Sequence, residues 1–160
     1  YANLDRGDLA AAEAAAYRAV AVVAGLSLEP HGVVAAQVLL AQVLRARGRV
    51  EEALELLDAA QDVTEPSLLF PLRQALAHRA GALLEAGRAE EALATARQAV
   101  AVPAEDIRSQ VVALRVLGAT LGACGDRAGA QAALEEALAI ATATEQRTEV
   151  AATERALAAL

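Results

Sequence analysis

The stretch Gly48-Arg49-Val50-Glu51-Glu52-Ala53-Leu54-Glu55-Leu56-Leu57-Asp58-Ala59-Ala60 decides the fold of this chain. Its glycine is followed after five residues by Ala53 and after a further seven by Ala60. Residues seven apart are separated by two helical turns, so both alanines lie on one face of a helix. The same arrangement starts from three other glycines, namely Gly7 with Ala12 and Ala19, Gly87 with Ala92 and Ala99, and Gly125 with Ala130 and Ala137.

The four glycines are separated by 41, 39 and 38 residues, and such a period indicates a repeat protein with two helices in each unit. A single helix pair is too thin to bury its apolar face, so neighbouring pairs must stack. We therefore expect an all-α fold, a right-handed α-solenoid of antiparallel helix pairs with about eight helices; the alternative is a closed helical bundle. The helix before each glycine repeats as well, with Ala41, Ala80 and Gly118 seven residues upstream and Leu44, Leu83 and Leu121 four residues upstream.

Composition supports helices and excludes several classes of partner. Alanine, the strongest helix former, makes up 45 of the 160 residues. The net charge is −7 and the 14 basic residues, all arginine, form no run, so we expect no direct contact with nucleic acid. The apolar stretches are shorter than the roughly 20 residues that cross a bilayer, so no membrane contact is expected. The single cysteine, Cys124, fits a reducing compartment, and we expect a cytoplasmic protein in which Cys124 packs between helices.

Glycine and proline divide the chain into helices. Gly7 is expected to end one helix, and Asp8 to begin the next, because a carboxylate suits the free N–H groups there. Pro71 should lie in the first turn of its helix, where its missing N–H costs nothing, while 25–32, with Pro30, is expected to be a break. The expected helices are Leu9–Ala24, Val33–Arg47, Val50–Val63, Leu68–Ala86, Ala89–Val102, Asp106–Cys124, Arg127–Ala143 and Glu145–Leu160.

We expect one domain over residues 1–160. The sequence has no methionine, which indicates an excerpt of a longer chain. The expected units are a partial repeat (1–30), three repeats (about 31–65, 66–104 and 105–144) and a terminal helix (145–160).

This pattern resembles the tetratricopeptide repeat (TPR) over nearly the whole chain, although its period is longer and leucine and alanine replace the family's aromatic residues. The resemblance implies a non-enzymatic scaffold that binds a protein or peptide. The segments that carry it are Ala41…Leu44…Gly48…Ala53…Ala60, Ala80…Leu83…Gly87…Ala92…Ala99 and Leu117-Gly118…Leu121…Gly125-Asp126…Ala130…Ala137.

A long-period, aromatic-poor form of this repeat is similar to the superhelical arms of large bacterial regulators, the MalT-like, LuxR-type and AfsR-like proteins. The segments Gly125–Leu138 and Thr153–Leu160 resemble the end of such arms. The resemblance implies a part in transcription regulation or signalling, with the ATPase and DNA-binding regions elsewhere. A small-molecule effector-sensing arm and a free-standing adaptor are the alternatives.

No set of residues predicts catalysis, a cofactor or a metal site. His31 and His78 are far apart in the sequence and have no cysteine partner. The pairs Glu51-Glu52, Glu90-Glu91 and Glu135-Glu136 recur in the repeats, but adjacent helical residues point about 100° apart and cannot face one substrate. We interpret these pairs as a solvated face, and we expect no enzyme activity.

By the TPR resemblance, the first helix of each pair lines a concave groove for the partner. A lining of small residues with scattered Arg and Gln suits an apolar helix or an extended segment. A carboxylate clamp is not expected, because Val38 and Gln42 stand where such clamps use Lys and Asn, while Arg45 and Arg115 would anchor polar groups. The expected lining is Val38, Gln42, Arg45, Gln74, Ala77, Gly81, Leu84, Arg115, Ala119 and Gly122.

The last five residues, Ala156-Leu157-Ala158-Ala159-Leu160, leave an apolar end on the array. Solenoids usually close with a polar capping helix. The sequence therefore predicts a homodimer formed through the exposed terminal helices.

Overall fold

The computed structural model describes residues 8–25, 30–60, 69–103 and 106–160, and every regular element in this part of the chain is a helix. This confirms the predicted all-α class and the predicted number of helices. None of these helices combines the length and apolar character that crossing a lipid bilayer demands. In chain order they are α2 (Leu9–Gly25), α3 (Pro30–Ala46), α4 (Val50–Ala59), α5 (Leu69–Glu85), α6 (Ala89–Ala101), α7 (Ile107–Ala123), α8 (Arg127–Ala143) and α9 (Arg147–Ala158).

The helix bounds lie within a few residues of the prediction. α8 has the predicted bounds, and Pro71 lies in the first turn of α5 as expected. α3 begins earlier than predicted, at Pro30, so residues 30–32 belong to a helix and not to the expected break. Proline suits the first helical position because it has no N–H to leave unpaired. Gly7 and residues 61–63, the predicted end of the helix that starts at Val50, lie outside the described residues.

One turn geometry joins α3 to α4, α5 to α6 and α7 to α8. Gly48 and Gly87 have a φ of 76° and Gly125 a φ of 86°, in the left-handed region that favours glycine at a helix end. The residue after each glycine donates its N–H at 2.9 Å to the carbonyl of the leucine four residues before the glycine. These pairs are Arg49 with Leu44, Arg88 with Leu83 and Asp126 with Leu121.

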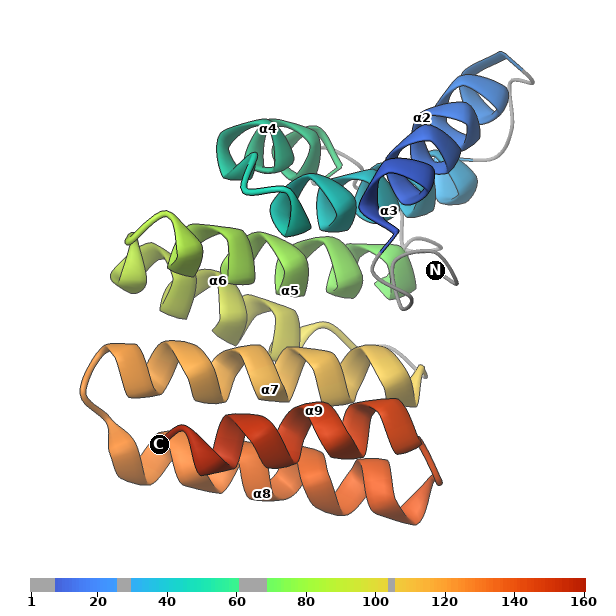
Figure 1. Ribbon diagram of the computed structural model, residues 1–160. Coiled ribbons are helices and arrows are strands. Elements are labelled where there is room, and N and C mark those ends of the chain that lie inside the picture. The colour runs from blue at the N-terminus through green and yellow to red at the C-terminus, as the bar shows by residue number, and fades with distance from the viewer. Residues whose placement is uncertain (1–7, 26–29, 61–68, 104–105) are drawn as a thin grey trace.

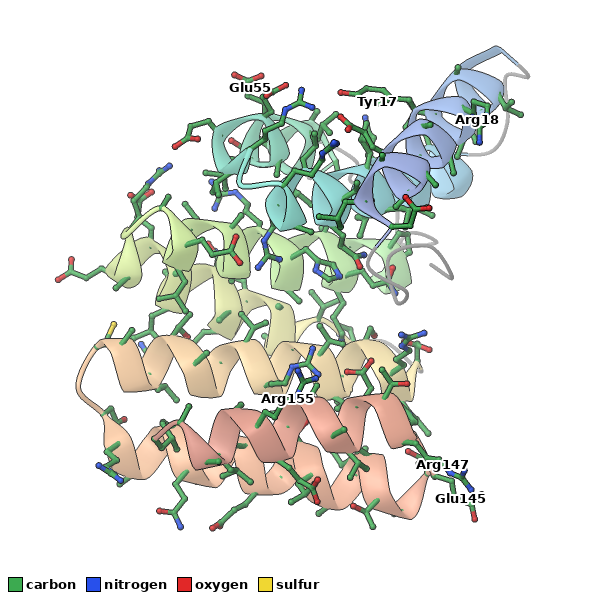
Figure 2. All side chains as sticks on the ribbon, in the orientation of Figure 1. Tyr17, Arg18, Glu55, Glu145, Arg147 and Arg155 are labelled. Atoms are coloured by element: carbon green, nitrogen blue, oxygen red, sulfur yellow. The ribbon has the colours of Figure 1, made fainter. Side chains whose placement is uncertain are left out.

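The same turn joins α8 to α9 without a glycine. Glu145 has a φ of 55°, and the N–H of Gln146 donates to the carbonyl of Ala141 at 2.9 Å. α9 consequently begins at Arg147, after the predicted start at Glu145. Figure 2 places Glu145 and Arg147 together at this corner of the molecule.

The helices stack as an array of pairs. α3 contacts α5, α5 contacts α7 and α7 contacts α9, so these four helices form one continuous layer, which we call the first-helix layer. The remaining helices pack beside their partners in the chain, and α5, α7 and α9 run across the molecule one below another (Figure 1).

Small residues bring the helices close together at the repeated positions. All six repeated alanines, five of them within α4, α6 and α8 and one at the C-cap of α4, are at most 1% exposed, which confirms them as packing positions. At Gly118 a Cβ atom would lie 2.6 Å from Cγ of Leu134, so α7 and α8 approach more closely than alanine would allow. The six alanines are Ala53, Ala60, Ala92, Ala99, Ala130 and Ala137.

Candidate functional site

A hollow of about 470 Å³ opens on the first-helix layer, and we call it the polar hollow. It receives side chains from α3, α5, α7 and α9, so it crosses the boundaries between successive helix pairs. Residues 74 and 78 on α5, and 108, 112 and 115 on α7, have the spacing of a single helix face. The lining residues are Ala35, Gln42, Gln74, His78, Asp106, Arg108, Ser109, Val112, Arg115 and Glu149.

At the α7–α9 side of the polar hollow, Glu149 is held between two arginines of α7. Nη1 of Arg115 donates to one carboxylate oxygen at 2.5 Å, and Nε of Arg108 donates to the other at 3.2 Å. The side chain of Glu149 is 7% exposed, against 25% for Arg115 and 57% for Arg108. The carboxylate is therefore almost fully enclosed, while the two guanidinium groups reach solvent.

Three neutral polar side chains, those of Gln42, Gln74 and His78, line the rest of the polar hollow. All three are half-buried, and no hydrogen bond joins any of these side chains to another residue that the structure describes. Burial, followed by the charges of three arginines, lowers the pKa of His78 to about 3. The imidazole is consequently neutral at pH 7, with one donor and one acceptor nitrogen.

Arg45 lies beside His78 but holds α3 against α5. Its Nε and Nη2 donate to the carboxylate of Glu85 at 3.1 and 2.6 Å, and its Nη1 donates to the backbone carbonyl of His78 at 3.3 Å. The guanidinium group covers Gly81, where a Cβ atom would lie 2.6 Å from Nη2. Arg45 is thus already engaged by the protein itself.

Five of the predicted groove residues line a hollow. Gln42, Gln74 and Arg115 line the polar hollow, which brings residues of three helices together. Ala119 and Gly122 line a different hollow at the end of α7. The structure therefore divides the predicted lining between two places.

Other predicted groove residues are covered by neighbouring helices. Val38 and Ala77 are fully buried, so the expectation that they present side chains to a groove needs correction. Gly81 lies beneath Arg45, and Leu84 packs against the main apolar cluster of the core. The physical reason is that each first helix is flanked by other first helices as well as by its partner, which leaves a narrower face open than the prediction assumed.

The prediction missed seven of the residues that line the polar hollow, namely Ala35, His78, Asp106, Arg108, Ser109, Val112 and Glu149. Four of these carried a signal, because each has the spacing of one helix face from a predicted lining residue. Ala35 precedes Gln42 by seven residues, His78 follows Gln74 by four, and Arg108 and Val112 precede Arg115 by seven and three. Glu149 carried none, because its place depends on how α9 packs across α7.

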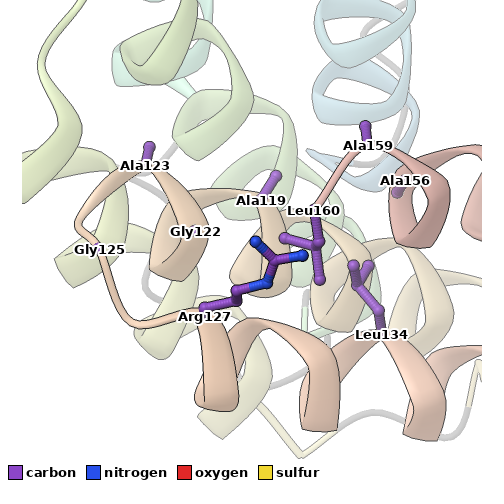
Figure 3. Close-up of a pocket in the computed structure, with 9 residues that line it drawn as sticks. All are labelled: Ala119, Gly122, Ala123, Gly125, Arg127, Leu134, Ala156, Ala159 and Leu160. Carbon is purple, nitrogen blue, oxygen red and sulfur yellow. The ribbon is translucent and has the colours of Figure 1, made fainter.

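The second hollow, of about 440 Å³, lies between the end of α7, the start of α8 and the end of α9, and we call it the apolar hollow (Figure 3). Leu134 and Leu160 are the two leucines among its lining residues, and Leu160 packs on Gly122. Arg127 is the one charged residue among the lining residues, and its guanidinium group extends toward Leu160 in Figure 3. No ion pair joins Arg127 to a carboxylate of the described residues, so this cation faces an apolar wall.

Neither hollow holds an arrangement with evident bond-making chemistry. Within the described residues, no group of three or more His, Cys, Asp and Glu side chains could hold a metal ion. Cys124 is exposed, contrary to the expectation that it packs between helices. It occupies the C-cap position of α7, where the chain leaves the helix packing for the turn.

Comparisons with known proteins agree with this architecture. Residues 33–65 and 111–145 match the family model of the tetratricopeptide repeat. The chain is similar to the nearly identical TPR-like repeats assigned to a kinesin light chain of Podosopora anserina, with 27% identity over 98% of this chain and 79% of that chain and a TM-score of 0.63. A form of those repeats with one glutamine replaced by methionine is similar too, with 29% identity over 91% of this chain and 72% of that chain and a TM-score of 0.59. No curated protein sequence matches the chain.

These similarities confirm the predicted TPR-like repeat fold. The narrower resemblance to the arms of bacterial regulators stays a prediction.

Proposed function

We propose that this chain is a non-enzymatic scaffold that binds a segment of another protein in the polar hollow. The observation that carries the proposal is the set of three half-buried polar side chains, those of Gln42, Gln74 and His78, which have no hydrogen-bond partner among the described residues. Such groups can exchange hydrogen bonds with the backbone amides of an extended peptide. The similarity to TPR repeats supports the proposal, because these repeats generally bind protein partners.

The position of the polar hollow favours an extended segment. Its lining comes from α3, α5, α7 and α9, so a bound chain would lie across the first-helix layer and touch several helix pairs at once. Ala35 and Val112 add short apolar surface between the polar groups. A segment with alternating polar and small apolar side chains would match this wall.

To test the proposal, a pool of end-capped nonapeptides is passed over the immobilised 160-residue chain, and the peptides that it retains are quantified by mass spectrometry. The variant Gln42→Ala/Gln74→Ala should bind the peptides that the wild type retains at least about tenfold more weakly, because each lost hydrogen bond is worth about 1 kcal/mol. Gln98→Ala, on the exposed face of α6, is the matched control and should bind like the wild type. Equal binding by all three proteins would place the partner site elsewhere.

A second candidate is a small-molecule effector site in the apolar hollow, and Arg127 favours it. A cation without a described ion-pair partner beside an apolar wall suits a short-chain carboxylic acid. A ligand that binds only the folded state raises its melting temperature. Octanoate, but not octanol, should therefore raise the melting temperature of the wild type and of Arg97→Gln, while Arg127→Gln should not respond. No rise with octanoate would leave the apolar hollow without this role.

Self-association and the parent protein are two further parts of the proposal. Ala158 and Ala159 are exposed at the end of α9, which supports pairing of two copies there. Pairing would be established by a sedimentation coefficient that rises with concentration in the wild type and stays constant in Ala159→Glu. A constant value for the wild type would refute it.

The intact mass of the native protein would decide between the arm of a regulator and a free-standing adaptor.

A further inference from the structure

We propose that Glu149 occupies, in the unliganded protein, the position that a carboxylate of the partner takes in the complex. The polar hollow then selects acidic segments, and their binding releases Glu149 from the arginines of α7. This inference rests on the peptide-binding function proposed above and names the chemistry of the peptide.

The contacts of Glu149 are those of a bound carboxylate. Both oxygens accept hydrogen bonds from guanidinium groups that belong to another helix. Arg108 and Arg115 are seven residues apart, two turns along α7, so they form a pair of donors on one helix face. Charge-assisted hydrogen bonds of this kind are roughly twice as strong as neutral ones, so the pair is a carboxylate-binding element.

Solvent reaches the arginines and not the glutamate, and this decides the charge of the partner. The side chain of Arg108 is more than half exposed and that of Arg115 a quarter exposed, whereas the carboxylate of Glu149 is enclosed. A basic segment would find the carboxylate of Glu149 covered, and the other carboxylate of the lining, that of Asp106, is half-buried and already accepts a hydrogen bond from the backbone N–H of Ser109. An acidic segment would meet guanidinium groups directly, and Arg115 donates through Nη1 alone to the described residues, so its other N–H groups can bind a second carboxylate before Glu149 leaves.

The exchange of one carboxylate for another leaves no enclosed charge unpaired. Removing Glu149 without a replacement would leave Arg115, whose side chain is only a quarter exposed, without its carboxylate, which is costly in a partly buried site. A neutral segment cannot supply the replacement, so it would leave the pair in place. Glu149 lies in the first turn of α9, whose N-cap residue Gln146 makes no side-chain capping bond, and helix ends open more readily than helix centres.

Two pools of end-capped nonapeptides, one with a central Glu and one with a central Gln among randomised uncharged residues, test the inference on the immobilised 160-residue chain. The wild type should retain the Glu pool at least about threefold more than the Gln pool. Glu149→Gln, which removes the carboxylate charge that Arg115 holds, should raise retention of the Glu pool about tenfold, the equivalent of one charge-assisted hydrogen bond, and leave the Gln pool unchanged. Arg115→Gln should abolish the preference.

Glu154→Gln, an exposed change of the same charge on the same helix, is the matched control and should behave like the wild type. If Glu149→Gln melts below the assay temperature, Arg108→Gln serves in its place, and it should cut the preference for Glu because that side chain mostly faces solvent. Equal retention of both pools by all folded variants, or the same gain in Glu154→Gln, would overturn the inference and leave peptide binding intact. No retention of either pool by any variant would refute the peptide-binding function itself.

Discussion

Glu145 adopts the backbone conformation that glycine adopts in the other three tight turns. The left-handed region costs a non-glycine residue about 1–2 kcal/mol, and a new glycine makes the unfolded chain somewhat more flexible. We expect Glu145→Gly to raise the free energy of unfolding by about 1 kcal/mol in urea titrations. Gly125→Ala makes the opposite change at an equivalent turn and should lower that free energy by a similar amount. A loss of stability in Glu145→Gly would mean that the carboxylate contributes more than the backbone conformation costs.

His78 should make the folded protein sensitive to mild acid. Burial and the nearby arginines lower its pKa from 6.5 to about 3. Between these values the unfolded chain binds a proton that the folded protein does not, so the free energy of unfolding falls as the pH drops through this window. Comparing urea titrations at about pH 6 and pH 4, we expect His78→Gln to remove a slope of about 1 kcal/mol per pH unit. An equal fall in the free energy of unfolding of the wild type and of His78→Gln between these pH values would show that His78 titrates normally.

Among the helices, α7 and α8 depend on the absence of a side chain at Gly118. Its place against Leu134 means that Gly118→Ala should lower the free energy of unfolding by about 1 kcal/mol, because overpacking outweighs the better helix propensity of alanine. Leu134→Ala should cost about 2–5 kcal/mol. In the double variant the contacts with the Leu134 side chain are gone and the close contact that remains is with the backbone oxygen of Ala130 at 3.1 Å, so the change at 118 should cost less than it does in the wild type. Additive effects in this double-mutant cycle would show that the two residues do not share space.

At the scale of single helices, the sequence carried most of the information. Gly48, Gly87 and Gly125 end helices because only glycine adopts a positive φ at little cost, and that requirement is visible in the sequence. The misplaced helix starts have a physical reason as well. Pro30 can either interrupt a helix or begin one, and no residue type marks Glu145 as left-handed.

For the whole array, Arg73 is a buried link between successive helix pairs. It is 5% exposed, and from α5 it donates through Nε and Nη2 to the carbonyl of Val102 at the end of α6 and through Nη1 to that of Asp106 before α7. Arg73→Met should lower the free energy of unfolding by about 1–3 kcal/mol, because the Val102 carbonyl would lose its charged donors.

The same variant should unfold over a broader urea range, because units of an array that are less well coupled unfold more independently. Arg97→Met, an exposed change on α6, is the control and should leave the transition unchanged within about 0.5 kcal/mol. A sharp transition of normal midpoint in Arg73→Met would show that apolar packing alone holds the pairs together.

The candidate site was less predictable than the fold, because it depends on how helices are set against one another. Glu149 meets Arg115 and Arg108 across 34 and 41 residues of sequence, and no local pattern shows that α9 delivers a carboxylate to α7. Val38 occupies a helical position that could face either a groove or a neighbouring helix. Only the packing of α3 against its neighbours places it in the core.

The matched turns at Gly48 and Gly87 also bear on how such a molecule can change in length. Both glycines have the same φ and are followed by the same hydrogen bond to an upstream leucine. The segment that begins at Arg49 and ends at Gly87 therefore carries the second half of the turn at its start and the first half of the same turn at its end. Tandem duplication of that segment, in a gene or at the bench, would recreate the turn at the new junction. The array can in this way grow or shrink by whole units without evolving a new connection.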